Sequence, residues 1–328
     1  MALTGGRISL RTLLGMFVGL GIVVATSAAA EGTKQLHVAI VSRTIFYLPV
    51  WLAAEKGYFK DEGLDVHIEV FDNAEKINGA LRENAVQIAV STPESIIVDA
   101  LKGGSLRMVA GNAGRLPHYV IAQPAIRSIA DLRGKTIGVL SNEEGTTHLV
   151  PEVTHSAGLE PSDYMVKAVG GAPTRWRLLR SGEIDAGLQP FPLSYEAEAA
   201  GFSNLGPLAD FVPDWQFTSV NADLRWAERH RMVLVSALRA LQRGLDAIIE
   251  DPAAAIRVAA RELQTDAKLA ERAIRDTARL GILTPKMEIS VAGTKRVHQA
   301  LIAAKLVHDE PFALERVSEA AFLQESRR

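Results

Sequence analysis

Short apolar runs and helical patterns alternate along the first two thirds of the chain. Residues 36–42 form a near-continuous apolar run with β-branched side chains, which is typical of a strand buried on both faces. Residues 65–71 alternate instead, so that two valines and an isoleucine share one face. Between these runs, Pro49 suits the first turn of a helix and Gly57 the left-handed position that ends one. The pattern predicts a strand, a helix and a parallel strand joined by a right-handed crossover.

The same alternation continues to about residue 220. We expect further strands at residues 86–91, 106–111, 118–123, 135–140, 163–169, 184–188 and 215–220. Helical patterns separate them, at residues 75–84, 93–101, 128–134, 147–158, 173–182 and 193–201. Such alternation predicts an α/β fold in which mostly parallel sheets are flanked by helices.

The last hundred residues have a different pattern. After Asp223 the sequence is almost entirely helical, with breaks near Asp251–Pro252, Thr265 and Gly281–Pro285. Arginines alternate with apolar positions in these helices, which indicates solvated helix faces. We therefore expect a helical C-terminal part.

Two stretches resemble each other. Residues 81–93 and residues 179–191 each contain a helix end, a polar turn, a short strand and a polar loop. Chance can produce such a match in any α/β protein, but two lobes of similar build would also produce it.

The first thirty residues are predicted to be a signal peptide. Arg7 and Arg11 precede an apolar run that is short for a membrane span, and Ala28 and Ala30 occupy the A-x-A positions of a cleavage site. The alternative is an uncleaved membrane anchor. Cleavage after Ala30 would remove two arginines and no acidic residue, and would change the net charge from −2 to −4.

Composition narrows the class further. The 328 residues are 48% hydrophobic and 23% charged, which suits two globular domains. The chain has no excess of basic residues and few aromatic residues, so the composition does not indicate nucleic-acid binding. The chain contains no cysteine, so an exported form depends on its core rather than on disulfides. The bacterial periplasm is the predicted compartment.

Candidate ligand contacts follow the strands. In open α/β sheets ligands bind beyond the carboxyl ends of strands, where helix N-termini present free N–H groups that favour anions. The loops in question are residues 42–47, 91–95, 111–115, 141–148 and 189–192. The candidate ligand-binding residues are Arg43, Phe46, Tyr47, Thr92, Asn112, Gly145, Thr146, Thr147, His148, Gln189 and Phe191.

These residues supply suitable chemistry as a set. Arg43 can pair with a carboxylate or sulfonate through two hydrogen bonds, while Phe46 and Tyr47 offer an apolar wall. Each residue taken alone also has a structural interpretation, such as a solvated arginine, a core aromatic residue, an N-cap threonine or a surface histidine.

Several phrases resemble a known superfamily. The segment "PVWLAAEKGYFKDEGLDVHIEVF" (residues 49–71), together with "SIADLRGKTIGV", "GTTHLVPEVTHSAGL" and "LRSGEIDAGLQPFP", is similar to exported binding proteins of the nitrate/sulfonate/taurine and thiamine-pyrimidine-precursor superfamily. The resemblance covers about residues 36–220. It specifies the superfamily but not the ligand.

The resemblance implies a type II periplasmic binding fold, in which two α/β lobes close on a solute. We place lobe 1 at residues 31–118 and 220–328 and lobe 2 at residues 119–219, with crossings near Pro117–Ala122 and Trp215–Val220. It also implies a monomer that delivers a small molecule to the permease of an inner-membrane ABC importer, whose ATPase is a separate subunit. No cofactor, catalytic residue or metal is expected.

The resemblance further implies which loops face the cleft. They are residues 43–47, 91–93, 145–148 and 189–191. Members often carry an aromatic residue after the strand that corresponds to 184–188, and here Phe191 stands nearby between two prolines. That departure leaves this aromatic contact open.

Three functions remain open at this point. The first is a receptor for an imported organic anion, with an aromatic carboxylate or aliphatic sulfonate favoured, or for a neutral pyrimidine or thiamine precursor. The second is an enzyme on the same fold, as in fungal thiamine-pyrimidine synthases, although nucleophile-elbow, P-loop and H-E-x-x-H motifs are missing from the sequence. The third is a periplasmic sensor, which needs the same closing cleft.

Overall fold

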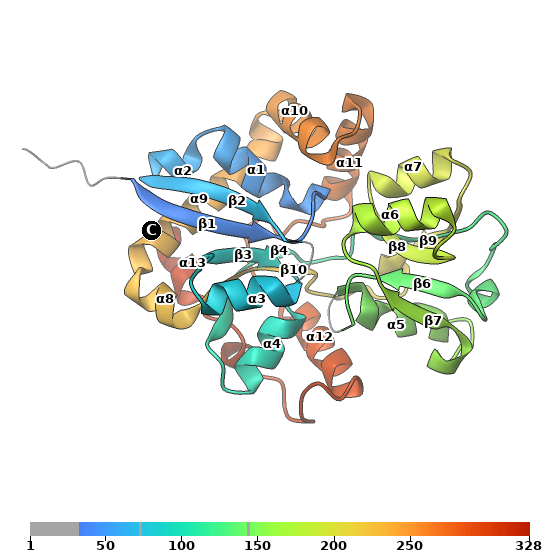
Figure 1. Ribbon diagram of the computed structural model, residues 1–328. Coiled ribbons are helices and arrows are strands. Elements are labelled where there is room, and N and C mark those ends of the chain that lie inside the picture. Colours follow the sequence, from blue (N-terminus) through green and yellow to red (C-terminus); the bar gives the residue numbers. More distant parts are fainter. Residues whose placement is uncertain (1–32, 72–73, 143–144) are drawn as a thin grey trace, which may run out of the picture. The chain divides into compact units, whose positions relative to one another are not determined.

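Two five-stranded sheets organise the chain (Figure 1). The computed structural model describes residues 33–71, 74–142 and 145–328, so the predicted signal peptide lies outside the described residues. The strand order is β2-β1-β3-β10-β4 in the first sheet and β7-β6-β8-β5-β9 in the second. The predicted α/β class with two sheets is confirmed.

Each sheet draws its strands from a limited part of the chain. The first contains β1 (Lys34–Ile40), β2 (Leu64–Val70), β3 (Ile88–Ser91), β4 (Leu106–Ala113) and β10 (Thr218–Asp223). The second contains β5 (His118–Ala122), β6 (Thr136–Val139), β7 (Met165–Ala168), β8 (Ala186–Pro190) and β9 (Ser203–Pro207). We call the elements between β5 and β9 the second lobe and the remainder the first lobe. The exact lobe boundaries stay a prediction.

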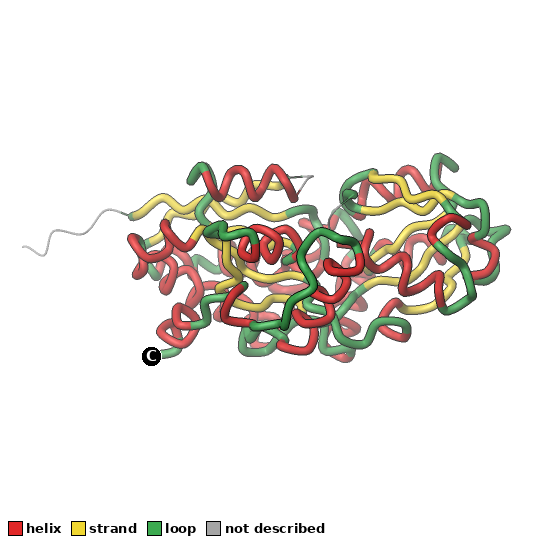
Figure 2. Tube along the Cα trace, turned by 90° about the horizontal axis from the view of Figure 1, so that it is seen from below, coloured by secondary structure: helices red, strands yellow, loops and turns green. Residues whose placement is uncertain are grey.

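Helices cover the sheets on the outside (Figure 2). The first lobe contains α1 (Leu48–Glu55), α2 (Tyr58–Asp61), α3 (Ala74–Arg82), α4 (Glu94–Leu101), α8 (Leu224–Arg229), α9 (Arg231–Glu250), α10 (Pro252–Leu263), α11 (Ala267–Arg279), α12 (Val291–Ala303) and α13 (Ala321–Ser326). The second lobe contains α5 (Val150–His155), α6 (Ala172–Ser181) and α7 (Leu193–Ala199). Short 3₁₀ helices include η1 (Ile45–Tyr47), η2 (Ile129–Leu132) and η3 (Gly145–Leu149).

Both sheets are mixed in the same way. In the first, β10 is antiparallel to β3 and β4, and the remaining pairs are parallel. In the second, β5 is antiparallel to β8 and β9. Four strands of each sheet therefore share a direction and one is reversed, which agrees with the predicted mostly parallel sheets. The reversed strands are those that follow a passage of the chain from one sheet to the other.

The passages differ slightly from the predicted ones. The chain leaves the first sheet through residues 114–117 and returns through residues 208–217, whereas the expected crossing at Pro117–Ala122 falls mainly on β5 itself. The last strand begins at Thr218 rather than at Trp215. Strand β9 was not predicted, because its Gly and Pro give no apolar alternation.

Most local predictions of turns are confirmed. Pro49 stands in the first turn of α1, and Gly57 follows the helix with φ of 74°. Gly182 ends α6 in the same left-handed region, at φ of 77°. The side chain of Asp251 accepts a hydrogen bond from Ala254 N at 3.1 Å and thereby caps α10 at the predicted break.

The long helix α9 packs against α1, α2, α10 and α13. Gly244 allows this approach, because a Cβ atom there would lie 2.2 Å from the carbonyl oxygen of Pro49. Among the residues that the structure describes, no helix has both the length and the apolar character needed to cross a membrane.

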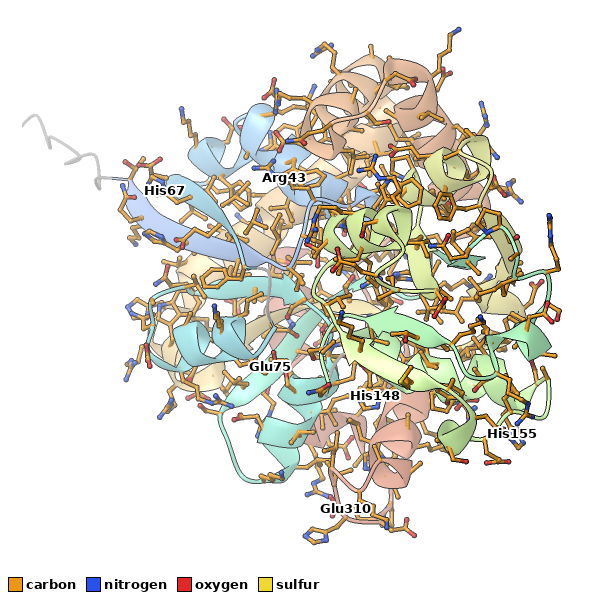
Figure 3. The ribbon with its side chains drawn as sticks, turned by 45° about the vertical axis from the view of Figure 1, so that its right-hand side comes forward. Arg43, His67, Glu75, His148, His155 and Glu310 are labelled. Carbon is orange, nitrogen blue, oxygen red and sulfur yellow. The ribbon has the colours of Figure 1, made fainter. Side chains whose placement is uncertain are left out.

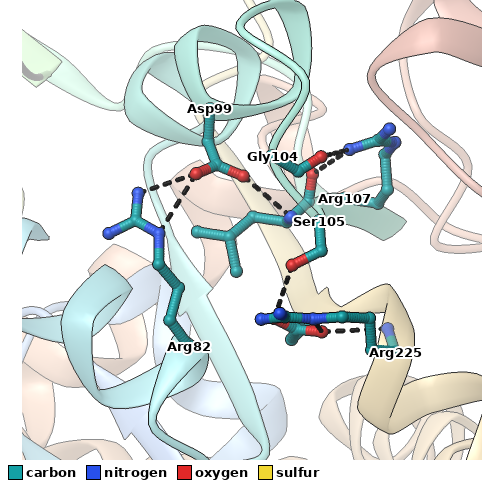
Figure 4. A network of polar contacts seen from close by, with 8 residues as sticks. Arg82, Asp99, Gly104, Ser105, Arg107 and Arg225 are labelled. Atoms are coloured by element: carbon teal, nitrogen blue, oxygen red, sulfur yellow. Dashed lines mark hydrogen bonds and ion pairs between the residues drawn. The ribbon is translucent and has the colours of Figure 1, made fainter.

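A polar network fixes the end of the first sheet where β4 begins and β10 ends (Figure 4). Arg82 of α3 donates to Asp99 of α4 at 2.8 and 3.1 Å, and the other carboxylate oxygen of Asp99 accepts from Leu106 N. Ser105 donates to Asp223 at 2.6 Å, and Arg225 pairs with the same carboxylate. The opposite ends of these strands face the second lobe (Figure 1).

Candidate ligand-binding site

A small cavity lies where the loops of the two lobes meet. Its volume is about 30 Å³. The first lobe contributes Val41, Ser42, Phe46, Tyr47 and Thr92. The second contributes His118, Leu140, Gly171, Ala172, Arg175 and Pro190, and the returning passage contributes Phe217. Because one water needs at least ~10–15 Å³ by this measure, the cavity has room for about two waters. An organic solute therefore fits between the closed lobes only if the cavity walls move apart from their present positions.

Aromatic rings form the first-lobe wall. The 3₁₀ turn η1 buries Phe46 and Tyr47, whose ring centroids lie 4.7 Å apart. Phe217 meets Phe46 edge-to-face at 5.0 Å. Burial raises the pKa of Tyr47, so its hydroxyl stays protonated. The wall is therefore apolar with one neutral hydroxyl group.

Asn112 supports this wall from behind. Its Nδ2 donates to the carbonyl oxygen of Phe46 at 3.0 Å and to the hydroxyl of Thr218 at 2.9 Å. Asn112 does not line the cavity. These two hydrogen bonds link the loop after β1 to strands β4 and β10.

A buried arginine forms the second-lobe wall. Gly171 is the N-cap of α6, and Arg175 lies in the first turns of the helix with 2% of its surface exposed. The guanidinium donates to the carbonyl oxygens of Leu188 at 2.7 Å and Gly170 at 3.1 Å. These bonds fix the orientation of the planar group at the cavity.

His118 stands between the two walls. It begins β5, is 3% exposed, and meets the edge of Phe217 at 4.8 Å between ring centroids. Burial, together with the positive charge of Arg175, lowers the pKa of His118 well below its ordinary value of 6.5. The imidazole is therefore neutral at physiological pH.

A larger hollow of about 420 Å³ adjoins the cavity and shares Val41 and Ser42 with it. We call this hollow the vestibule. Arg43 lines it and forms an ion pair with Glu262 of α10. On the second-lobe side Arg180 lies 5.2 Å from the ring centroid of Trp176. The vestibule is therefore lined by residues of both lobes.

Contacts away from the cavity also join the lobes. The hydroxyl of Tyr195 in α7 donates to Asp276 of α11 at 2.5 Å, and Arg272 lies 3.7 Å from the centroid of the Tyr195 ring. Arg296 of α12 pairs with Glu152 of α5 at 2.6 Å. These groups hold the lobes together in the present conformation.

The predicted site residues fall into separate groups. Phe46, Tyr47 and Thr92 line the cavity, and Arg43 lines the vestibule. Gln189 is fully buried against α6, and the amide orientation that satisfies both of its polar atoms donates to Ala172 O at 3.2 Å and accepts from Trp176 N at 3.1 Å. As ligand contacts, all of these residues stay predictions.

The remaining predicted residues lie elsewhere. Phe191 stacks on Tyr195 with centroids 5.7 Å apart and lines another hollow, between the two passages. The hydroxyl of Thr147 donates to the carbonyl oxygen of Ser141, and His148 is buried in η3, apart from Arg43 (Figure 3). Of Gly145 and Thr146 the structure describes only the backbone, which begins η3.

Sequence reasoning missed Arg175, His118 and Phe217. Arg175 follows Pro173 in a predicted helix that opens after a strand, so its place near a helix N-terminus was a signal. His118 and Phe217 flank the passages between the sheets, and their position becomes evident only once the strand order is known.

A further hollow, in the first lobe, is mostly apolar. This groove has a volume of about 470 Å³ and is lined by α9, α11, the loop before α12 and the passage at Gly114 and Arg115. Residues of the second lobe do not contribute to it. Within residues 33–71, 74–142 and 145–328, no group of three or more His, Cys, Asp or Glu could hold a metal ion.

Comparison with known sequences identifies relatives. The family model described as "NMT1/THI5 like" matches residues 46–255. A protein of Brucella abortus (strain 2308), named only as a binding protein, is 31% identical over 170 residues, which are 51% of this chain and 52% of that protein. The chain thus aligns with about half the length of the curated relatives it matches. An enzyme also matches, the Saccharomyces cerevisiae 4-amino-5-hydroxymethyl-2-methylpyrimidine phosphate synthase THI13, at 27% identity over 150 residues, 44% of this chain and 42% of that one.

Solved structures share the fold. A protein from Bordetella bronchiseptica RB50 superimposes with a TM-score of 0.76 at 22% identity, covering 90% of this chain and 97% of that one. The alkanesulfonate-binding protein SsuA from Xanthomonas axonopodis pv. citri, solved with MOPS bound, superimposes with a TM-score of 0.69 at 16% identity, covering 88% and 97%. The periplasmic-binding-protein fold expected from the sequence is confirmed.

Proposed function

The chain belongs to the NMT1/THI5-like family, and from this premise we propose that it is the solute-binding component of an ABC importer. In this proposal the protein acts in the periplasm, captures a small organic anion between its lobes, and delivers it to an inner-membrane permease. An aromatic carboxylate or an aliphatic sulfonate is the favoured solute.

One observation carries the proposal. The buried guanidinium of Arg175 lines a cavity whose opposite wall consists of the rings of Phe46, Tyr47 and Phe217. A guanidinium remains charged in proteins, and its planar group matches a carboxylate or sulfonate with two parallel hydrogen bonds. The aromatic wall suits a flat or apolar body. The two walls therefore suit a solute that has one acidic end and one apolar end.

Closure follows from the division of these groups between lobes. Arg175 belongs to the second lobe and the ring of Phe46 to the first, so a solute that contacts both is bound best when the lobes are together. Ligand then shifts the hinge equilibrium through its greater affinity for the closed state. No catalytic group is needed for this step.

The partners belong to the same proposal. Members of this fold include proteins that bind sulfonates, such as the SsuA structure, and this supports an acidic solute here. Delivery requires a permease that distinguishes the closed, loaded form from the open one. We expect the receptor to work as a monomer.

An enzyme remains the second candidate, because the yeast synthase is a relative. The cavity hydroxyl of Ser42 lies 3.5 Å from the hydroxyl of Thr44, and a threonine hydroxyl is too weakly basic to activate a serine as a general base would. We therefore favour binding. Turnover of a bound compound by the pure protein would establish catalysis instead.

Ligand-induced thermal stabilisation tests the proposal. The panel contains aromatic carboxylates, aliphatic sulfonates and a neutral aminopyrimidine, each at the same concentration. At 100 times its dissociation constant, a true ligand stabilises the folded state by about 2.7 kcal/mol. We expect a clear shift for at least one anion. A shift with the pyrimidine and with no anion would overturn the anion assignment.

A further inference from the structure

The imidazole of His118 has no hydrogen-bond partner among the described residues. It lines the cavity, is 3% exposed, and its Nδ1 atom is completely enclosed. Neither ring nitrogen takes part in any of the hydrogen bonds of the described chain. Arg175, by contrast, reaches the same cavity already oriented by backbone carbonyls.

An enclosed polar group without a partner is unusual. Nearly all buried polar atoms in proteins are paired, because an unpaired one loses its bonds to water and gains nothing in return. A phenylalanine would fill this place without that cost, since the neighbouring side chains of Phe46 and Phe217 are apolar. The imidazole therefore requires an explanation, and a group supplied by the solute is the simplest.

The protonation state of the ring limits what that group can be. Burial and the nearby guanidinium of Arg175 both disfavour the imidazolium form. A neutral imidazole offers one N–H donor and one acceptor nitrogen. The guanidinium also disfavours a cationic group on the solute at this position. An uncharged hydroxyl, amide or ring-nitrogen group fits both conditions.

We propose that His118 is a specificity-determining residue, whose imidazole hydrogen-bonds a second, uncharged polar group on the bound anion. This inference rests on the function proposed above and narrows it. The solute is then a small acid that carries, beside its acidic group, a hydroxyl or a nitrogen of an aromatic ring. A plain aromatic or alkyl acid would leave the imidazole unpaired and would bind more weakly.

Matched pairs of ligands test this inference by calorimetry. Benzoate is compared with the three hydroxybenzoates and the three pyridinecarboxylates, so that the polar group is placed at each ring position. Ethanesulfonate is compared with 2-hydroxyethanesulfonate for the aliphatic class. We expect the wild type to favour one polar member over its plain partner by tenfold or more.

The variant His118→Phe separates specificity from affinity. We expect it to lose the preference for the polar member, so that the polar and plain members of each pair bind it with similar affinity. If the preference survives in His118→Phe, the inference is wrong. Equal losses for both members, with a lower melting temperature of the unliganded protein, would show a purely structural role and would also overturn it.

Two controls keep the result interpretable. His118→Leu repeats the measurement if His118→Phe does not fold. Arg175→Gln tests the acidic end separately, and we expect it to weaken plain and polar members alike. If no anion of the panel binds the wild type, the proposed function fails with the inference. If anions bind without any preference for a polar group, only the inference fails.

Discussion

The cavity between the lobes and the apolar groove of the first lobe differ in volume and in the groups that line them. The groove is some fifteen times larger, at about 470 against 30 Å³, yet its walls are mostly aliphatic side chains of α9, α11 and the loop before α12. The cavity brings a guanidinium, an imidazole and three aromatic rings to one point. Convergent polar groups in an apolar setting mark a binding site better than volume does.

The two hollows also differ in what a ligand could do to the fold. The groove has no residue of the second lobe in its walls, so an occupant gains nothing when the lobes close. The cavity takes residues from both lobes and Phe217 from the returning passage. Of these two hollows, the cavity is therefore the one in which binding energy is coupled to the hinge.

The largest expected effect is a loss of anion affinity, which we expect for a substitution of Arg175 in the cavity and not for one of Arg115 in the groove. We expect Arg175→Gln to weaken binding of an anionic ligand by at least ~100-fold, because a charge-assisted hydrogen bond to a buried guanidinium is worth roughly 1.5–3 kcal/mol and two are lost. Arg175→Lys keeps the charge and should lose less. Calorimetry with the best anion measures both.

Arg115 in the groove is the matched control. Arg115→Gln should change affinity less than ~2-fold, because Arg115 is exposed, its charge is screened by solvent, and it does not line the cavity. Equal losses for the two variants would place the anion outside the cavity. Melting curves without ligand show whether Arg175→Gln still folds, since it also loses bonds to two carbonyls.

The next effect concerns the contact that holds the lobes together. Tyr195→Phe removes the hydrogen bond from the Tyr195 hydroxyl to Asp276, which joins α7 to α11. A bond to a charged acceptor contributes roughly 1.5–3 kcal/mol, so we expect ligand dissociation to accelerate about tenfold. Stopped-flow displacement measures the rate.

Tyr164→Phe provides a control within one lobe. Its hydroxyl lies 3.2 Å from the hydroxyl of Thr154, and both residues belong to the second lobe. This substitution should lower stability slightly and leave the dissociation rate unchanged. If both tyrosine variants release ligand at the same rate, the contact between α7 and α11 does not control closure.

A pH effect of intermediate size follows from the buried histidine. The pKa of His118 in the folded protein lies below the ordinary 6.5 of the unfolded chain, so the unfolded state binds the extra proton first. Stability from this group is present above pH 6.5 and falls as the pH drops towards the folded pKa, by at most ~1.4 kcal/mol per pH unit.

We expect His118→Phe to flatten the decline in unfolding free energy between pH 7.5 and 5.5, measured by urea denaturation. His155→Asn is the control, because the side chain of His155 is 80% exposed. An unchanged pH profile in His118→Phe would mean that the imidazole is solvated in the folded protein.

The smallest effect is expected in the groove. Ile249 lines it with 80% of its surface exposed. Ile249→Ser should change the unfolding free energy by less than ~0.5 kcal/mol and leave anion affinity unchanged. A loss of affinity comparable with that of the Tyr195 variant would show that the groove contributes to solute binding.

The sequence was sufficient for most of the fold because local signals were strong. Proline in the first turn of α1, glycines after α1 and α6, and the Asp251 cap all act through their own backbone geometry. Strand β9 and the start of β10 were missed or misplaced, since their limits depend on pairing with β5 and with β3 and β4. Pairing is not a local property.

The site was less predictable for the same reason. Loop position gave Phe46, Tyr47 and Thr92, which line the cavity. It could not give side-chain direction, so Asn112 turned out to bond Phe46 and Thr218, and Gln189 to fit against α6. Arg175 reaches the cavity from within a helix, and only the placement of that helix reveals it.

Mass spectrometry of the solute retained by gently purified protein tests the central claim most directly. We expect the wild type to carry an organic acid in near-stoichiometric amount, and Arg175→Gln, purified in parallel, to carry none. A neutral compound held equally by both proteins would contradict an anion site at Arg175.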